Sequence, residues 1–109
     1  MRAPELTGRV ALVTGAGRGR GRAMALGLAQ AGAKVVATAA REAGEPEAVA
    51  AQDPGRILAL VADVTQATDA ARAVAMALER FGRLDILVNN AGRGMKYVSE
   101  RFLNEPTRF

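Results

Sequence analysis

Four glycines at alternate positions constrain the fold of this 109-residue chain more than any other feature. They follow the apolar run Val10–Val13 and overlap the start of an alanine-rich stretch with helical character, residues 20–31. A buried strand, a tight turn and a helix N-terminus in this order form a site for phosphate, because the first N–H groups of a helix are unpaired and attract anions. The four positions are Gly15, Gly17, Gly19 and Gly21. The segment therefore predicts a turn that binds the pyrophosphate of a nucleotide.

The spacing of these glycines excludes two common phosphate-binding motifs and fits a third. The dinucleotide fingerprint G-x-G-x-x-G fails in both registers, because Arg20 and Arg22 stand where its last glycine belongs. The P-loop motif fails as well, since no Gly-Lys pair follows at the required spacing. The pattern T-G-x-x-x-G-x-G matches residues 14–21.

Apolar runs alternate with helical stretches along the chain. Four runs lack polar alternation, which is typical of strands buried on both faces of a parallel sheet, and these are Val10–Val13, 35–38, 57–62 and Ile86–Val88. Between them we expect a helix at 20–31 that stops at Gly32, a short one from about Pro46, and a third at 66–81. This β-α-β-α-β-α-β order implies right-handed crossovers and a doubly wound α/β fold.

The third expected helix has the clearest boundary signals. Thr65 is a suitable N-cap, and Gly82 is a suitable helix end. We expect one face of this helix to carry its apolar side chains, namely Ala67, Ala71, Val74, Ala75 and Leu78.

A second motif follows the fourth apolar run, where L-D-I-L-V at 84–88 leads into N-N-A-G at 89–92. Together with the glycine motif at 14–21, it resembles the short-chain dehydrogenase/reductase family. The resemblance implies a Rossmann-like, doubly wound parallel sheet of strand order 3-2-1-4, with the ligand at the carboxyl ends of the strands. It also implies an oxidoreductase that transfers hydride between NAD(P) and a small alcohol or carbonyl substrate.

The resemblance assigns cofactor-binding roles to residues of both motifs. Gly15 would allow the tight turn, Gly19 the close approach of the pyrophosphate, and Gly21 the close packing of helix on strand. After the third strand, Asp63 would accept a hydrogen bond from the adenine amino group while Val64 lies against the ring. The cofactor-binding residues expected in this way are Thr14, Gly15, Gly17, Arg18, Gly19, Arg20, Gly21, Arg41, Asp63, Val64, Asn89, Asn90, Ala91 and Gly92.

Each of these positions also has a purely structural interpretation. The glycines can form a turn without a ligand, Asp63 can favour a helix start through its charge, and the N-N-A-G segment can be a plain turn. In the functional interpretation, the asparagine amides bond to neighbouring strands while backbone groups meet the adenosine ribose. Arg20 departs from the family, which most often has an aliphatic residue there. Its cation is either a phosphate contact or a tolerated substitution.

The end of the second strand bears on the choice between NAD and NADP. A NAD site places an acidic residue about 20 residues beyond the glycines to bind the ribose 2′-hydroxyl, but Ala39 stands there. Arg18 and Arg41 can instead neutralise a 2′-phosphate. We therefore expect NADP as the cofactor, with NAD as the alternative. The other interpretation of both arginines is a solvated surface position.

The catalytic residues of the family have no match in this sequence. The family uses a Tyr-x-x-x-Lys pair, in which the lysine lowers the pKa of the proton-donating tyrosine. Here Tyr97 is the one tyrosine, Arg101 stands four residues later, and both come directly after the second motif. We therefore expect no catalytic residue, no dehydrogenase activity from this chain alone, and a sheet incomplete at the C-terminal side. Residues 1–109 are expected to form one NAD(P)-binding domain, either the N-terminal part of a longer enzyme or a truncated product.

Composition limits the other functions. Without cysteine or histidine, the chain lacks the commonest metal ligands, and we expect no metal. No apolar run is long enough for a membrane span and no secretory signal precedes the fold, which favours a cytoplasmic protein. The net charge of +4 and the Arg-Gly alternation at 17–22 raise the alternative of nucleic-acid binding, but this tract occurs once and has no aromatic neighbour. A non-catalytic nucleotide-binding module is the other alternative, and for the complete enzyme we expect a homo-oligomer.

Overall fold

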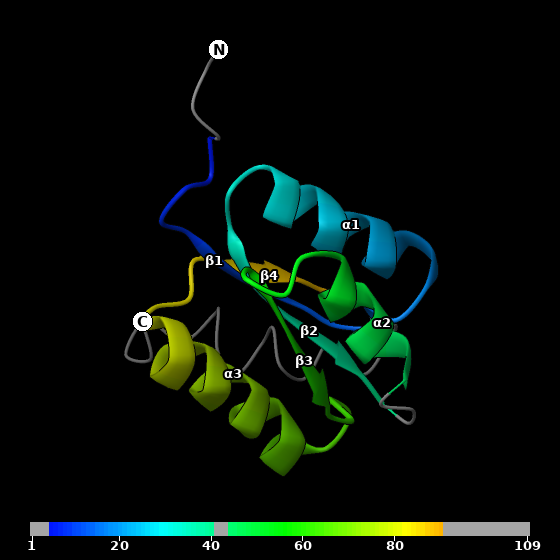
Figure 1. Cartoon of the computed structure of the whole chain (residues 1–109). Helices are drawn as coiled ribbons and strands as arrows, with labels where there is room; N and C mark the ends of the chain where they lie inside the picture. Colours follow the sequence, from blue (N-terminus) through cyan, green and yellow to red (C-terminus); the bar gives the residue numbers. More distant parts are fainter. Residues whose placement is uncertain (1–4, 41–43, 91–109) are drawn as a thin grey trace.

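The computed structural model describes residues 5–40 and 44–90, in which four strands and three helices alternate (Figure 1). The strands are β1 (Val10–Val13), β2 (Lys34–Ala39), β3 (Ile57–Val61) and β4 (Ile86–Val88). The helices are α1 (Gly19–Gln30), α2 (Gly44–Gln52) and α3 (Ala67–Phe81). The expected bounds of β1 and β4 are confirmed, and the bounds of β2, β3, α1 and the start of α3 differ from those expected by one residue.

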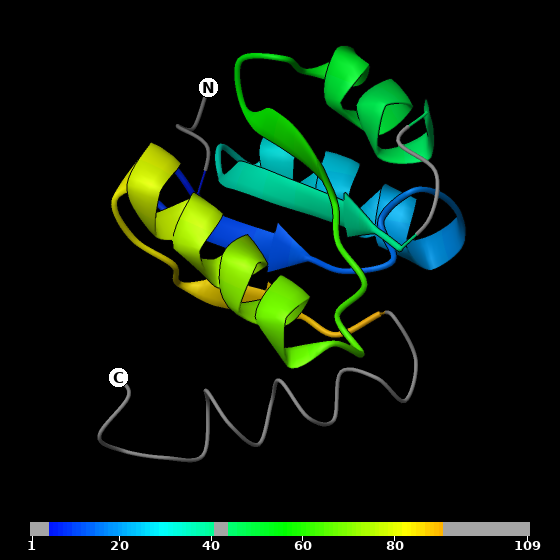
Figure 2. The ribbon, with the colours of Figure 1, turned by 90° about the horizontal axis from the view of Figure 1, so that it is seen from below.

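The four strands form one parallel sheet in the order β3-β2-β1-β4, which confirms the expected fold class and strand order. Val13 at the end of β1 pairs with Ala37 of β2 on one side and with Val88 of β4 on the other. Helices α1 and α2 cover one face of the sheet and α3 covers the other (Figure 2). Because the strands are parallel, the loops after β1, β2 and β4 leave the sheet at the same edge, which we call the carboxyl edge.

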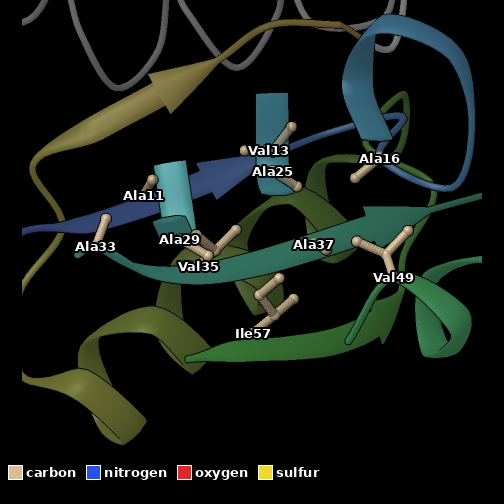
Figure 3. Packing of buried hydrophobic residues seen from close by; sticks show 10 residues of the cluster. All are labelled: Ala11, Val13, Ala16, Ala25, Ala29, Ala33, Val35, Ala37, Val49 and Ile57. Atoms are coloured by element: carbon tan, nitrogen blue, oxygen red, sulfur yellow. The ribbon is translucent and has the colours of Figure 1, made fainter. Parts of the chain in front are cut away.

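Two apolar clusters, one on each face of the sheet, make up the core. Successive residues of a parallel strand point to opposite faces, so a strand covered on both sides is apolar throughout. Figure 3 shows the cluster under α1 and α2, which contains Ala11, Val13, Ala16, Ala25, Ala29, Ala33, Val35, Ala37, Val49 and Ile57. The cluster under α3 contains Val10, Leu12, Val36, Leu60, Ala62, Ala73 and Ala77. Alanine supplies much of the helical side of both clusters, so the helices lie close to the sheet.

Two expectations for α3 are wrong. Its N-cap is Gln66 rather than Thr65, because the Thr65 N–H and hydroxyl both donate to the Asp63 carboxylate in the preceding turn. The buried face is formed by Ala70, Ala73 and Ala77, with Val74 half-buried. The remaining expected members, Ala67, Ala71, Ala75 and Leu78, are exposed. Six alanines form two overlapping stripes on this helix, and apolar character alone does not decide which stripe meets the sheet.

The expected end of α3 is confirmed. Gly82 adopts the left-handed conformation, with φ of 83°, and its N–H donates to the Leu78 carbonyl at 2.9 Å. At 15 residues α3 is the longest helix in the described part of the chain, and no helix there is long and apolar enough to cross a membrane.

Candidate functional site

The two sequence motifs meet at the carboxyl edge of β1 and β4. The buried Thr14 hydroxyl donates to the Val88 carbonyl at 3.4 Å and accepts the Asn90 N–H at 3.2 Å. The Asn90 side-chain amide donates to the Gly15 carbonyl at 3.1 Å. Two segments about 75 residues apart in the chain are thus held together by side-chain hydrogen bonds. The Asn90 amide therefore bonds to the glycine turn that follows β1, and not to a strand as expected.

The glycines of the turn have three different structural requirements. Gly15 and Gly19 both adopt φ of 61°, in the left-handed region that disfavours other residues. A Cβ at Gly21 would collide with the Gly15 carbonyl and lie 2.5 Å from the Asn90 amide nitrogen, so the start of α1 packs directly on the turn. A Cβ at Gly17 would lie 2.6 Å from the Cβ of Glu45. A Cβ at Gly19, by contrast, would meet no other part of the described chain within 4 Å, apart from its neighbours in the turn and in α1.

The N-terminus of α1 lies beside this open space and receives no side-chain cap from its N-cap residue. Its N-cap, Arg18, has an extended backbone and makes no side-chain capping hydrogen bond. The first turn contains no acidic residue, and its residues Gly19 and Arg20 are exposed. The first N–H groups of the helix, which carry the positive end of its dipole, are therefore available to an anion.

A cation and an anion meet beside the turn. Nε of Arg18 lies 3.8 Å from Oε2 of Glu45 in the first turn of α2. The Arg18 side chain is 87% exposed and that of Glu45 is 38% exposed, so water screens this pair strongly. Sequence reasoning missed Glu45, because its position beside Gly17 depends on how α2 packs against the turn.

A pocket of about 190 Å³ lies at the same edge, between the ends of β2 and β3. Its lining combines small apolar side chains with a few polar groups: Gly15, Thr38, Ala40, Ala62, Asp63, Val64 and Thr65. Gly15, Asp63 and Val64 were expected at a cofactor site, while Thr38, Ala40, Ala62 and Thr65 were missed. Their proximity follows from the register that aligns the ends of β2 and β3.

The Asp63 carboxylate organises the loop that enters α3. Oδ1 of Asp63 accepts the Thr65 N–H at 3.0 Å and the Thr65 hydroxyl, while the Asp63 N–H donates to Asp69 at 2.8 Å. Asp63 thus has a structural role in the turn ahead of α3, whereas its expected effect on the helix start through charge stays a prediction. A contact between Asp63 and adenine stays a prediction, as does the packing of the buried Val64 against the ring.

The remaining expected site residues fall into two groups. Asn89 is exposed at the end of β4, and Ala39 ends β2 with 8% exposure. Arg41, Ala91 and Gly92 lie outside the described residues. Tyr97 and Arg101, which were not expected to be catalytic, also lie outside them. Within residues 5–40 and 44–90, no group of three acidic side chains is placed to hold a metal ion.

Asp85 satisfies polar groups at the opposite, amino edge of the sheet, where β1 and β4 begin. Its Oδ2 accepts the Val10 N–H at 2.8 Å, and its own N–H donates to the Val10 carbonyl at 2.8 Å. Arg83 donates to both carboxylate oxygens at 2.7 to 3.1 Å, and Arg9 lies 3.5 Å away. The hydrogen bonds from Arg83, followed by the one from Val10, hold the pKa of Asp85 below its ordinary value of 3.8.

With this geometry in place, comparison with known proteins identifies the family. The family model for short chain dehydrogenase matches residues 9–107, a range that includes both motifs. The chain therefore belongs to the short-chain dehydrogenase family, whose members are oxidoreductases with a Rossmann-type NAD(P)-binding fold.

Several reductases are similar to this chain. It is 43% identical over 104 residues to the A-factor type gamma-butyrolactone 1'-reductase (1S-forming) of Streptomyces virginiae, which covers 93% of this chain and 40% of that protein. It is 47% identical over 90 residues to a hydroxynaphthalene reductase-like protein of Metarhizium robertsii, with 80% of this chain and 34% of the other covered. A solved structure of 3-ketoacyl-(acyl-carrier-protein) reductase from Brucella melitensis, complexed with NADH, matches with a TM-score of 0.77 at 48% identity.

The chain spans well under half of the length of these relatives. The match to the Brucella melitensis reductase covers 81% of this chain but 36% of that one. The similarity therefore concerns the part of the family fold that contains the glycine turn and the four strands described above.

Proposed function

We propose that residues 1–109 form the NAD(P)-binding domain of a short-chain oxidoreductase that acts on a small alcohol or carbonyl compound. The observation that carries the proposal is the arrangement of the carboxyl edge. There a helix N-terminus without a side-chain cap from Arg18, a turn with glycines at positive φ and a pocket with apolar walls lie together. This set of features suits an anionic pyrophosphate joined to a flat heterocycle.

The proposed roles follow from the contacts of each residue. The turn at Gly15 and Gly19 and the first N–H groups of α1 bind the pyrophosphate. Thr14 and Asn90 fix the turn against β4, so they position it without touching the phosphates. Asp63 and Val64 hold the adenine in the pocket. When bound, the nicotinamide cofactor supplies or accepts the hydride, and this chain's own residues bind and orient it.

NADPH is the preferred cofactor in this proposal. Ala39 presents no carboxylate to a ribose 2′-hydroxyl, and Arg18 extends beside the turn with an 87% exposed side chain. Arg41 is proposed as the second cation. Glu45 lowers the affinity for NADPH in this proposal, because its carboxylate pairs with Arg18 and repels a 2′-phosphate. One related reductase is described as complexed with NADH, so both cofactors belong in the test.

Fluorescence titration of the chain with NADPH and with NADH tests the proposal. We expect saturable binding of both, with NADPH tighter. Arg18→Ala should lower the affinity for NADPH by about fivefold and that for NADH by less than about twofold, since an exposed charge contact contributes modestly to binding. Arg22→Ala, an exposed arginine one turn along α1, is the matched control and should leave both affinities unchanged. Failure of both cofactors to bind would refute the proposed function, and tighter NADH binding would refute the preference.

A further inference from the structure

In the described part of the chain, one buried side-chain polar atom has no hydrogen-bond partner. The side chain of Thr38, the second-last residue of β2, is 1% exposed. Within residues 5–40 and 44–90, its hydroxyl is the one buried side-chain polar atom without a hydrogen bond. Such groups are rare in folded proteins, because a buried hydroxyl without a partner has lost its bonds to water and gained nothing in return.

The fold itself does not require a hydroxyl at this position. Val36 lies two residues earlier on the same face of β2 and is fully buried in the cluster under α3. Valine and threonine have the same shape, so valine would fill the Thr38 position without the unpaired oxygen. The hydroxyl therefore calls for a partner from outside the described chain.

The position of Thr38 indicates where that partner binds. Thr38 lines the pocket at the carboxyl edge, next to Ala62, Asp63 and Val64. The neighbouring main chain is already paired, since the Thr38 carbonyl accepts the Ala16 N–H at 2.8 Å and the Ala39 carbonyl accepts the Ala62 N–H at 3.0 Å. The Asp63 carboxylate, which also lines the pocket, accepts hydrogen bonds from Thr65 two residues later. A ligand in the pocket thus meets apolar walls and one hydroxyl that still lacks a partner.

We propose that the Thr38 hydroxyl hydrogen-bonds the adenosine part of the bound dinucleotide, directly or through one ordered water. This inference deepens the proposed function and rests on it. An adenine ring offers both nitrogen acceptors and an amino donor, and a hydroxyl can serve either as donor or as acceptor. The apolar lining of Ala40, Ala62 and Val64 suits the faces of a flat ring, while Thr38 recognises its polar edge.

The test separates affinity from stability in a set of matched variants. Thr38→Val removes the hydroxyl and keeps the shape, and Thr38→Ser keeps the hydroxyl. Thr38→Val should lower the affinities for NADH and for ADP about tenfold, while the melting temperature of the ligand-free chain stays equal or rises. Thr38→Ser should bind both ligands within about threefold of the original chain. Val36→Thr, the control, places an unpaired hydroxyl away from the pocket and should lower the melting temperature without changing affinity.

Each other outcome contradicts the inference. Unchanged affinity in Thr38→Val would show that the hydroxyl does not contact the ligand. A lower melting temperature of ligand-free Thr38→Val would show that the hydroxyl supports the fold instead. Weaker NADH with unchanged ADP would place the contact outside the adenosine. If the original chain binds neither ligand, the proposed function fails first, and this result is distinct from a failure confined to Thr38→Val.

Discussion

The amino and carboxyl edges of the same parallel sheet satisfy their polar groups in opposite ways. At the amino edge, Asp85 and Val10 exchange hydrogen bonds and two arginines neutralise the carboxylate. At the carboxyl edge, as far as residues 5–40 and 44–90 show, α1 begins without a side-chain cap and the Thr38 hydroxyl is unpaired. The first arrangement is complete within the protein, whereas the second leaves donors for a ligand. In the proposed function, a single fold thus separates stabilisation from binding by assigning them to opposite edges of its sheet.

The largest effect is expected at the closest backbone contact of the carboxyl edge. Gly21→Ala would drive a Cβ into the Gly15 carbonyl and the Asn90 amide. Because backbone atoms cannot move aside easily, the free energy of unfolding should fall by about 3 kcal/mol. Urea denaturation measures this loss. Gly27→Ala in the same helix, where a Cβ meets nothing within 4 Å, is the control and should stabilise the chain slightly.

The second prediction compares two glycines that share a positive φ and open surroundings. Gly19 lies at the turn and Gly82 at the end of α3, near the amino edge. Gly19→Val and Gly82→Val should both destabilise the fold through backbone strain, by about 1–2 kcal/mol. Of the two variants, only Gly19→Val should lower the affinity for NADPH, by at least about 100-fold, because its side chain fills the space proposed for the pyrophosphate. Calorimetric titration measures the affinity of each variant for NADPH. Equal affinities would contradict the assignment of cofactor binding to the carboxyl edge.

The third prediction concerns pH at the amino edge. The folded-state pKa of Asp85 lies below the ordinary value of 3.8, to which it returns on unfolding. Its ionisation therefore stabilises the fold fully above that value, and this contribution is lost as the pH falls through the lower, folded-state pKa. Asp85→Asn should thus be less stable than the original chain at pH 7, and the difference should shrink in acid.

Urea denaturation at pH 7 and in acid measures this difference, and NADPH titration gives the second readout. Asp85→Asn should leave the NADPH affinity unchanged at pH 7, since the proposed cofactor site lies at the opposite edge. Asp53→Asn, which disrupts the exposed pair with Arg56, is the control and should have a smaller effect on stability. A pH-independent difference for Asp85→Asn would contradict the assignment of the stabilisation to its charge.

The sequence predicts most of the fold because the relevant signals are local. The apolar run of β1 ends at Thr14 and that of β4 at Asn89, and the bounds of both strands are confirmed. The buried face of α3 was missed, since alanines on two stripes differ little in hydrophobicity. Thr38 and Glu45 were missed for another reason. Their roles depend on how distant segments pack together in space. The Thr38 hydroxyl is buried without a hydrogen-bond partner, and Glu45 forms an ion pair with Arg18 of the glycine turn.

The smallest effect is expected from Glu45. Glu45→Gln would release Arg18 from its 3.8 Å ion pair and remove a negative charge from the region of the 2′-phosphate. The affinity for NADPH should rise about threefold, in keeping with an exposed pair, while that for NADH changes less. In an Arg18→Ala background the same substitution should have a smaller effect. A fall in NADPH affinity would mean that Glu45 positions Arg18 for the phosphate instead of competing for it.

The contrast between the two edges is tested most directly by NMR. The 11.3 kDa chain is small enough for a titration in which NADPH is added and every amide shift is followed. We predict saturable shifts at the carboxyl edge, in the amides of Gly15, Gly19, Thr38 and Val64. At the amino edge, we predict unchanged amides for Arg9, Gly82, Arg83 and Asp85. Saturable shifts that concentrate at the amino edge, or no saturable shift at the glycine turn, would contradict the assignment of binding to the carboxyl edge.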